Sequence, residues 1–404
     1  MKILIVNSDS PNNRGDRAIL EGGIKLIRQR FPNSDIWSTS EMSERDKEWY
    51  GINFLPMSVH TTNPFKLLRL GLFARRCDIV FWGGGELLKD YTNKFGLIYW
   101  VVKMLIVRIF NEKLYGFYQG IGPTKSLLAR KLIAFIVNQT KRFFVRDEES
   151  AQKLREWGAK TPITPSFDPA ILCSSQPLSK EELAQLAKEF DTTSEFLKKA
   201  IGIGARNWFH YKTSSWIPIR YLRMFGLGKT RPSSKSEQYK IHLAKLCDKL
   251  IEEQDANVIF FPMHTSIYEN DVGFSRQVQQ LMKNKTRVRI IAQDTLSPQA
   301  FHNTIGACRA FIGFRLHSFI LATVACIPAV VFYYVDKGRV FADQIGMSDY
   351  CWPIEDLLKE DALRKTERMI SKLVGNHKEV GDRVAIRLNM MRIDLITVFN
   401  KTFS

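Results

Sequence analysis

Met1-Lys2-Ile3-Leu4-Ile5-Val6-Asn7 opens the chain as a short, almost continuous apolar run, and a polar loop follows it at residues 8–15. From Asp16 onward, apolar residues recur at the spacing of a helix that buries one face. The run is too short to be the core of a secretion signal, so we expect a buried strand rather than a cleaved leader. Strand, loop and helix in this order form the first unit of a parallel α/β sheet.

The same alternation continues along the chain and falls into two halves. We expect further strands in the first half at residues 79–82, 113–118 and 142–145, before the polar stretch 173–199. The second half has strand patterns at residues 200–204, 257–261, 289–292, 310–313 and 329–333, followed by two helical segments. The sequence therefore predicts an α/β protein of two Rossmann-like domains, residues 1–175 and 176–404, that face a cleft.

Charge and cysteine usage narrow the possible partners. The 404 residues include 59 lysines and arginines against 41 aspartates and glutamates, a formal net charge of +18. Such a positive field favours an anionic substrate, anionic lipid or nucleic acid, but no nucleic-acid-binding motif is recognisable. The six cysteines form no CxxC pair and no His/Cys cluster at zinc spacing. We expect a reduced, cytoplasmic protein without a metal site.

Three basic and apolar segments in the first half suggest contact with a membrane surface. No run of apolar residues is long enough to span a bilayer, since residues 97–110 are interrupted by Lys103 and Arg108. Residues 65–76, 97–108 and 127–142 mix lysine or arginine with large apolar side chains. Helices that lie on an anionic membrane have this composition, and so do ordinary amphipathic helices packed on a sheet. We favour peripheral contact with the inner face of the cytoplasmic membrane.

Polar and glycine-rich corners follow the strands of the first half, at the edge where open α/β sheets bind ligands. Each corner also has a purely structural interpretation: Asp16 as a helix N-cap, a tight turn at residues 119–123, and an Asp-Pro turn at Asp168. Three consecutive glycines, residues 83–85, favour a close approach to a ligand. The candidate residues of this half are Asn13, Gly15, Asp16, Gly84, Gly85, Glu86, Gln119, Gly120 and Asp168.

In the second half, the corner Phe314-Arg315-Leu316-His317-Ser318 combines an arginine fork, a histidine and the start of a helix, which suits a carboxylate or phosphate. Arg206 follows another strand of this half, and both arginines could grip one small dianion or form ordinary ion pairs. His264 marks a further strand end. The insertion at residues 206–236 holds lysines, arginines and aromatics without an acid, so it suits a sugar, a base or a membrane interface, or is a disordered loop.

In this order, the corners resemble those of the polysaccharide pyruvyl transferase family over nearly the whole chain. The matching segments are Asn13-Arg14-Gly15-Asp16-Arg17-Ala18-Ile19-Leu20, Gly83-Gly84-Gly85-Glu86, Gln119-Gly120-Ile121-Gly122-Pro123, Val145-Arg146-Asp147 with Ser150, Asp168-Pro169-Ala170, Arg315-Leu316-His317-Ser318, and residues 328–333 with Lys337. The resemblance implies a metal-independent relative of the GT-B glycosyltransferase fold. It further implies phosphoenolpyruvate as donor substrate, no cofactor, and a sugar diol of a glycan as acceptor. Because of the basic and apolar segments of the first half, we expect this acceptor to be a lipid-linked oligosaccharide or glycan precursor.

By this resemblance, Arg315, the backbone at Leu316, and His317 contact the donor in the second domain, and Arg206 matches a family arginine. Ser318, His264 and Lys337 complete the predicted binding residues of that domain, and the first domain faces the acceptor. The long insertion departs from compact family members and leaves the acceptor open.

Ketal formation from an enol phosphate gives these residues definite tasks. C3 must gain a proton while a sugar hydroxyl attacks C2, after which phosphate leaves and a second hydroxyl closes the ring. Arg315 and Arg206 would hold the carboxylate and phosphate, and His317 would move a proton. Asp16, Glu86 or Asp168 would take the hydroxyl proton, and we favour Asp16.

Two other functions remain open from the sequence. One is a glycosyltransferase of the same architecture that uses a nucleotide sugar. The other is a basic binding protein for membranes or nucleic acid without catalysis.

Overall fold

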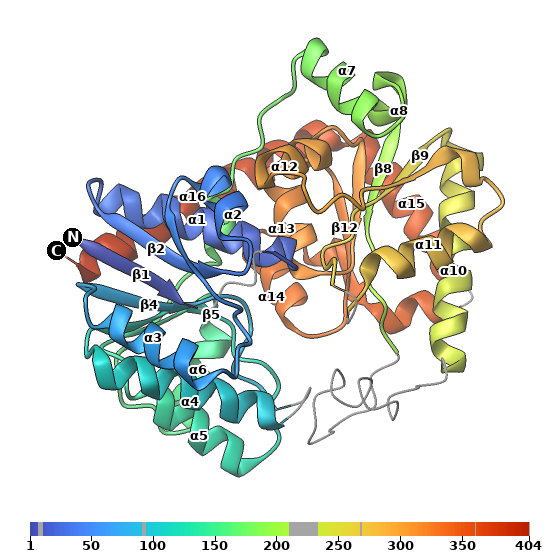
Figure 1. Ribbon diagram of the computed structural model, residues 1–404. Coiled ribbons are helices and arrows are strands. Elements are labelled where there is room, and N and C mark those ends of the chain that lie inside the picture. The colour runs from blue at the N-terminus through green and yellow to red at the C-terminus, as the bar shows by residue number, and fades with distance from the viewer. Residues whose placement is uncertain (7–10, 91–93, 210–232, 267–268, 360, 404) are drawn as a thin grey trace.

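The computed structural model describes residues 1–6, 11–90, 94–209, 233–266, 269–359 and 361–403. Two parallel sheets form two lobes, as the strand patterns predicted (Figure 1). The first has seven strands in the order β3-β2-β1-β4-β5-β6-β7. Its strands are β1 Lys2–Val6, β2 Asp35–Ser40, β3 Asn53–Pro56, β4 Ile79–Gly83, β5 Leu114–Gln119, β6 Phe143–Val145 and β7 Ile163–Pro165.

The second sheet has six strands in the order β10-β9-β8-β11-β12-β13. They are β8 Ala200–Gly204, β9 Asn257–Phe260, β10 Val288–Ile290, β11 Ala310–Gly313, β12 Ala329–Tyr333 and β13 Cys351–Pro353. In each sheet the described strand pairs run parallel, and the strand order reverses direction next to β1 or β8. This topology confirms the expected pair of Rossmann-like domains.

Helices cover both faces of the first sheet because the side chains of β1 alternate between two apolar cores. Ile3 and Ile5 pack with the face that contains α1, whereas Leu4 and Val6 pack with the opposite face. That opposite face is covered by α3, α4 and α5. The helices are α1 Arg14–Arg30, α2 Ser43–Tyr50, α3 Pro64–Ala74, α4 Lys94–Phe110, α5 Leu127–Val137, α6 Glu148–Glu156 and the 3-10 turn η1 Pro169–Leu172.

The remaining helices surround the second sheet, except that the last one returns to the first. They are α7 Lys180–Glu189, α8 Ser194–Lys198, α10 Ser234–Gln254, α11 Asp271–Leu281, η2 Lys285–Arg287, α12 Pro298–Gly306, α13 Leu316–Val324, α14 Lys337–Gln344, η3 Ser348–Tyr350, η4 Ile354–Leu358, α15 Ala362–Gly375 and α16 His377–Thr402. Phe399 of α16 packs 5.8 Å from Phe81 and 6.0 Å from Phe144 between ring centroids. The terminal helix therefore adds to the core of the first lobe, although the division at residue 175 assigns it to the second.

Several local expectations change. Asn13, not Asp16, is the N-cap of α1: its side chain accepts from the backbone of Gly15 and Asp16, which places Asp16 in the first turn. The third basic segment stops being helical at Val137, before residue 142. Most of the insertion at residues 206–236 lies outside the described residues. Among the helices of the described ranges, none is long and apolar enough to cross a bilayer.

Candidate active site

The carboxyl ends of the two sheets meet where the loop after β1 pairs with the loop after β9. Asn13 forms an isolated antiparallel bridge with His264. The backbone N–H of Arg14 donates to the Met263 carbonyl at 2.8 Å, and that of Thr265 donates to the Asn12 carbonyl at 2.9 Å. The ligand-binding edges of both sheets therefore face one another across a short backbone ladder.

Arg14 fixes this junction from inside the protein. Its side chain is only 1% exposed and donates to the carbonyls of Pro262 and Ile291, each at 2.9 Å, and of Gln293 at 2.6 Å. Burial, with the nearby Arg17 charge, lowers the pKa of Arg14 to about 9. Because every one of these acceptors belongs to the second lobe, Arg14 is a residue of the lobe junction.

His317, at the start of α13, lies beside Asp168, which precedes η1 of the other lobe. His317 Nε2 and Asp168 Oδ2 are 3.4 Å apart. Burial by itself would raise the pKa of Asp168, but its interactions with His317 and Arg146 lower it to about 2. Burial also lowers the pKa of His317, although Asp168 opposes this effect. At neutral pH the pair is therefore an aspartate carboxylate beside a neutral imidazole.

Glycine corners make room for this pair and for the charges next to it. A Cβ at residue 15 would lie 2.4 Å from His317 Nδ1, and one at residue 120 would lie 2.2 Å from Arg146 Nη2. Gly84 and Gly85 have φ angles of 97° and 60°, which side chains rarely adopt. A side chain at residue 15 or 120 would therefore collide with His317 or Arg146, which explains why these two predicted corners carry glycine.

Arg146 and Glu86 connect the His317 pair to the second lobe. Arg146 Nη1 is 3.3 Å from Asp168 Oδ2, and its Nη2 is 3.7 Å from Glu86 Oε2. Lys337, at the start of α14, places its Nζ 3.6 Å from the same Glu86 oxygen. Positive and negative side chains from both lobes therefore alternate along the junction, and all but Arg146 were among the predicted site residues.

Arg206 and Arg315 converge on one carboxylate. Arg315 Nη2 lies 2.6 Å from Glu269 Oε2, and Arg206 Nη2 lies 3.3 Å from the same oxygen. The Nε of Arg315 is also 2.8 Å from Asp271 Oδ2. Burial would lower the pKa of Arg315, but Asp271 and Glu269 raise it, whereas the two arginines keep the pKa of Glu269 well below its usual range. The two arginines thus form a grip for a carboxylate-sized anion.

An aromatic pair borders this grip. The ring centroid of Tyr334 lies 4.3 Å from the Arg206 guanidinium carbon and 4.6 Å from the ring of Trp208. Burial would raise the pKa of Tyr334, but Arg206, Lys337 and Arg315 together lower it. Tyr334 therefore stands between the Arg206–Arg315 grip and Lys337.

Other predicted residues hold the backbone or lie beside these clusters. Ser318 Oγ donates to the Arg315 carbonyl at 2.7 Å, and Gln119 Nε2 donates to the Trp82 carbonyl at 3.0 Å. Leu316 begins α13 and is buried. His264 Nδ1 is 3.0 Å from Ser266 Oγ, and burial lowers the pKa of His264 to about 4, which leaves it neutral.

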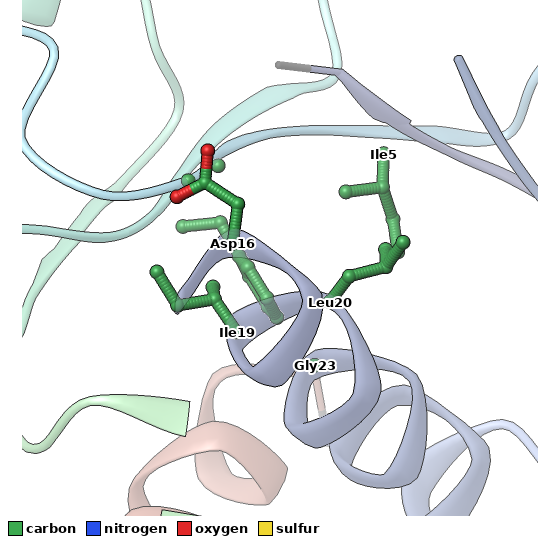
Figure 2. Close-up of a pocket in the computed structure, with 8 residues that line it drawn as sticks. Ile5, Asp16, Ile19, Leu20 and Gly23 are labelled. Carbon is green, nitrogen blue, oxygen red and sulfur yellow. The ribbon is translucent and has the colours of Figure 1, made fainter. Parts of the chain in front are cut away.

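Asp16 lines a narrow apolar recess. Ile5, Leu20 and Gly23 form part of the same lining, together with the glycines that end β4 (Figure 2). The acid placed directly against His317 is Asp168. The assignment of Asp16 as the residue that takes the proton of the acceptor hydroxyl stays a prediction.

Sequence reasoning overlooked Arg146, Glu269 and Tyr334 as site residues. Arg146 and Tyr334 each follow a strand directly, so the strand-end rule that selected Asp168 could also have selected them. Glu269 follows β9 at a greater distance, and no local pattern relates it to two arginines on other strands.

Two Rossmann-like lobes with charged side chains between their carboxyl edges define a protein of the GT-B type. The UDP-GlcNAc 2-epimerase of Methanocaldococcus jannaschii aligns over 91% of this chain and 92% of its own, with 12% identity and a TM-score of 0.53. The ADP-heptose LPS heptosyltransferase II of E. coli aligns over 94% of this chain and 100% of its own, with 14% identity and a TM-score of 0.53. At these identities the likeness shows the fold alone.

Within this fold class, the chain belongs to the polysaccharide pyruvyl transferase family, whose model matches residues 13–336. The amylovoran biosynthesis protein AmsJ of Erwinia amylovora is 21% identical over 432 aligned residues, which cover 97% of both chains. The family resemblance seen in the strand-end motifs is thereby confirmed. By its family, the protein is a polysaccharide-modifying transferase.

Proposed function

We propose that this protein transfers pyruvate from phosphoenolpyruvate to a sugar diol of an exopolysaccharide or other cell-surface glycan precursor, forming a ketal and releasing phosphate. The convergence of Arg206 and Arg315 on one carboxylate oxygen, at 3.3 and 2.6 Å, carries the proposal. A donor with both a carboxylate and a phosphate matches two guanidinium forks that already hold a carboxylate. The family and the amylovoran relative support the polysaccharide acceptor.

The geometry suggests how the reaction proceeds. Arg206 and Arg315 bind the donor anion in competition with Glu269 and stabilise the departing phosphate. His317 is neutral at neutral pH, so it accepts the proton of the attacking sugar hydroxyl, and Asp168 orients its ring. His317 delivers the proton taken from the first hydroxyl to C3 as C2 is attacked, and the second hydroxyl then displaces phosphate from C2 while its own proton leaves on the phosphate. No cofactor enters this sequence.

Phosphate release tests the proposal directly. Purified protein is incubated with phosphoenolpyruvate and lipid-linked glycans, and we expect phosphate release that depends on the acceptor and is lost in Arg315→Lys and Arg206→Lys. Arg339→Lys is the matched control, because Arg339 forms an ion pair with Glu149 at the half-exposed end of the junction. Turnover in that control should remain near wild type.

The same preparation separates the alternatives in a calorimetric titration. Saturable binding of a nucleotide sugar without binding of phosphoenolpyruvate would favour a glycosyltransferase, a reaction that the GT-B-type fold also accommodates. Salt-sensitive binding to membranes or nucleic acid that survives Arg315→Ala and His317→Ala, with no turnover, would favour a binding protein.

We also propose that the first lobe rests on the inner face of the cytoplasmic membrane, where a lipid-linked acceptor would lie. Helices α3, α4 and α5 pack side by side and contain no aspartate or glutamate. Phe65, Ile109 and Leu127 are 79%, 78% and 72% exposed. The other large exposed apolar side chains of these helices are Leu68, Leu72, Phe95, Ile98, Val102, Leu128 and Phe135.

The fully exposed basic side chains of this surface come from two of the three segments that the sequence singled out, since Arg108 of the remaining segment is only partly exposed. Lys66 and Arg69 of α3 and Lys131 of α5 are exposed. Lys103 of α4 points inward instead: it is 1% exposed, donates to the Val59 carbonyl, and burial lowers its pKa to about 7. Exposed apolar side chains with cations and no acids on one helical layer match an anionic bilayer.

Liposome flotation tests the membrane contact. We expect the protein to float with vesicles that contain phosphatidylglycerol, to stay behind with pure phosphatidylcholine, and to dissociate in high salt. The double variant Phe65→Ser and Leu127→Ser should lose flotation. Ile386→Ser, which changes a 66% exposed residue of α16, should not. Equal flotation of all three proteins would exclude this surface.

A further inference from the structure

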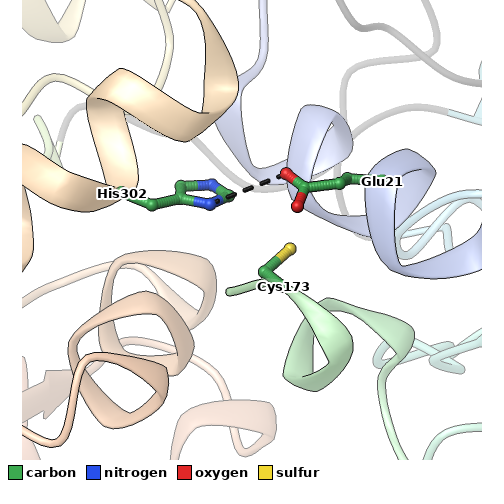
Figure 3. Close-up of side chains that lie close together, drawn as sticks. All are labelled: Glu21, Cys173 and His302. Carbon is green, nitrogen blue, oxygen red and sulfur yellow. Dashed lines mark ion pairs between the residues drawn. The ribbon is translucent and has the colours of Figure 1, made fainter. Parts of the chain in front are cut away.

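Three potential metal ligands from distant parts of the chain meet beside the lobe junction. Glu21 lies on α1, Cys173 follows η1, and His302 lies on α12 of the second lobe (Figure 3). One ligand atom from each side chain, an oxygen, a sulfur and a nitrogen, lies within 4.8 Å of the other two. None of the three takes part in the anion-binding clusters described above.

Two atoms of this cluster are buried without a hydrogen bond. His302 and Cys173 are 2% and 1% exposed. His302 Nδ1 faces Glu21 Oε2 at 3.6 Å, and neither atom has a hydrogen-bond partner among the residues that the structure describes. An unsatisfied buried nitrogen and carboxylate oxygen destabilise a fold, and such pairs are rare unless another group bridges them.

The known hydrogen bonds of the cluster do not account for these two atoms. Lys25 Nζ lies 2.7 Å from Oε1 of Glu21, which is the other carboxylate oxygen. The Cys173 thiol donates to the Ala18 carbonyl at 3.3 Å and also interacts with the Glu21 carboxylate. The hydrogen bonds with Lys25 and Ala18 therefore do not involve His302 Nδ1 or Glu21 Oε2. These two atoms face each other, and the sulfur of Cys173 lies beside them.

The donor set selects a class of metal. An imidazole nitrogen, a cysteine sulfur and a carboxylate oxygen together suit Zn²⁺ and its close relatives, whereas Mg²⁺ and Ca²⁺ prefer oxygen alone. The Nδ1 atom of His302 faces Glu21 without a hydrogen-bond partner among the described residues, and a neutral imidazole coordinates through such a nitrogen. A hydrogen bond with the Ser174 backbone also holds this ring, as second-shell partners do for metal-bound histidines.

We propose that Glu21, Cys173 and His302 bind one zinc-like divalent ion that ties α1 and the start of the interlobe segment to α12. Coordination forms the S–metal bond and releases the thiol proton of Cys173. Water completes a tetrahedral shell. The ion would reach the site from solvent past Glu21, whose side chain is 14% exposed.

Cobalt substitution tests this site with a readout independent of catalysis. Full-length protein without a histidine tag is stripped with chelator and titrated with Co²⁺ and Zn²⁺. We expect one equivalent of Co²⁺ to give a sulfur-to-metal charge-transfer band that Zn²⁺ abolishes, and Zn²⁺ to raise the thermal midpoint reversibly. Affinity should increase with pH, because binding releases a proton.

Variants assign the ligands. Cys173→Ser should abolish the charge-transfer band, and His302→Gln should keep it but weaken binding at least about ten-fold. Cys247→Ser is the matched control, since Cys247 is a fully buried free thiol of α10. If Cys173→Ser does not fold, Glu21→Gln replaces it in the test. Because Glu21 is partly exposed, this variant should fold, and it should bind Co²⁺ more weakly than the wild type does.

Absence of a stoichiometric band in the wild type, or a band that persists in Cys173→Ser, would overturn the proposal. The phosphate-release assay is scored separately, so failure of the metal site leaves the proposed transferase function standing.

Discussion

At the scale of single residues, Gly15 decides whether His317 can reach its place. The position is helical, so alanine would not by itself disfavour the local backbone. Its methyl group, however, would meet the imidazole at 2.4 Å. We expect Gly15→Ala to lower the rate of phosphate release about 10²-fold, because a shift of roughly 1 Å in a catalytic group has effects of that size. Gly375→Ala is the control, since a Cβ there meets nothing within 4 Å.

The pair of His317 and Asp168 predicts a pH dependence. The pKa of His317 is lowered by burial and raised by Asp168. In the proposed reaction His317 is the base and is active when neutral, so the rate should rise with pH through its pKa and level off by neutral pH. Asp168→Asn removes the negative charge that raises the pKa of His317. The acidic limb of the pH–rate profile should therefore move to lower pH, while the maximal rate falls. Glu149→Gln alters the partly exposed ion pair with Arg339 and should leave the acidic limb of the pH–rate profile in place.

At the scale of elements, the strand-end rule explains why Arg206 and Arg315, the arginines of the proposed donor site, converge. Gly204 of β8 and Gly313 of β11 are register partners in adjacent parallel strands. Arg206 and Arg315 each stand two residues beyond one of these glycines, so equal steps along parallel strands bring them together. This part of the site was predictable, because parallel pairing aligns the carboxyl ends of neighbouring strands.

Helix α1 gives a stability prediction at the same scale. Arg14→Leu removes the donors for three carbonyls of the second lobe, and we expect it to destabilise the fold by on the order of 3 kcal/mol. Urea unfolding followed by circular dichroism measures the change. Arg28→Leu on the exposed face of the same helix should change stability little. Similar losses in both variants would mean that Arg14 acts through helix propensity instead of the lobe junction.

At the scale of the whole molecule, α16 connects the lobes by packing on the first sheet after the second is complete. Phe399 is fully buried among Phe81, Phe117 and Phe144. We expect Phe399→Ala to destabilise the protein by about 3 to 5 kcal/mol, the usual effect of emptying a buried phenylalanine site. Thermal unfolding measures it, and Ile393→Ala at a 58% exposed site of the same helix is the control. An unchanged midpoint in Phe399→Ala would show that the terminal helix is dispensable to the core.

Helix α14 joins the lobes near the site. Gln344 Nε2 donates to the Arg146 carbonyl at 3.2 Å. With Lys337 beside Glu86, these contacts place one helix of the second lobe against the strand ends of the first. The relative position of the lobes, and thus of the two charge clusters, depends on contacts far apart in the chain.

The sequence by itself determined the two-lobed parallel α/β architecture, though not the outer strands β2, β3 and β13, and the nearby strand-end positions of Arg206 and Arg315. Apolar periodicity and parallel pairing are local or nearest-neighbour properties, and both can be read along the chain. Only the tertiary structure decided that Asp168 faces His317, that Glu269 lies between the arginines, and that Glu21, Cys173 and His302 meet. Each of these contacts joins segments that no periodic pattern relates, because they are brought together by the packing of one lobe or loop against another.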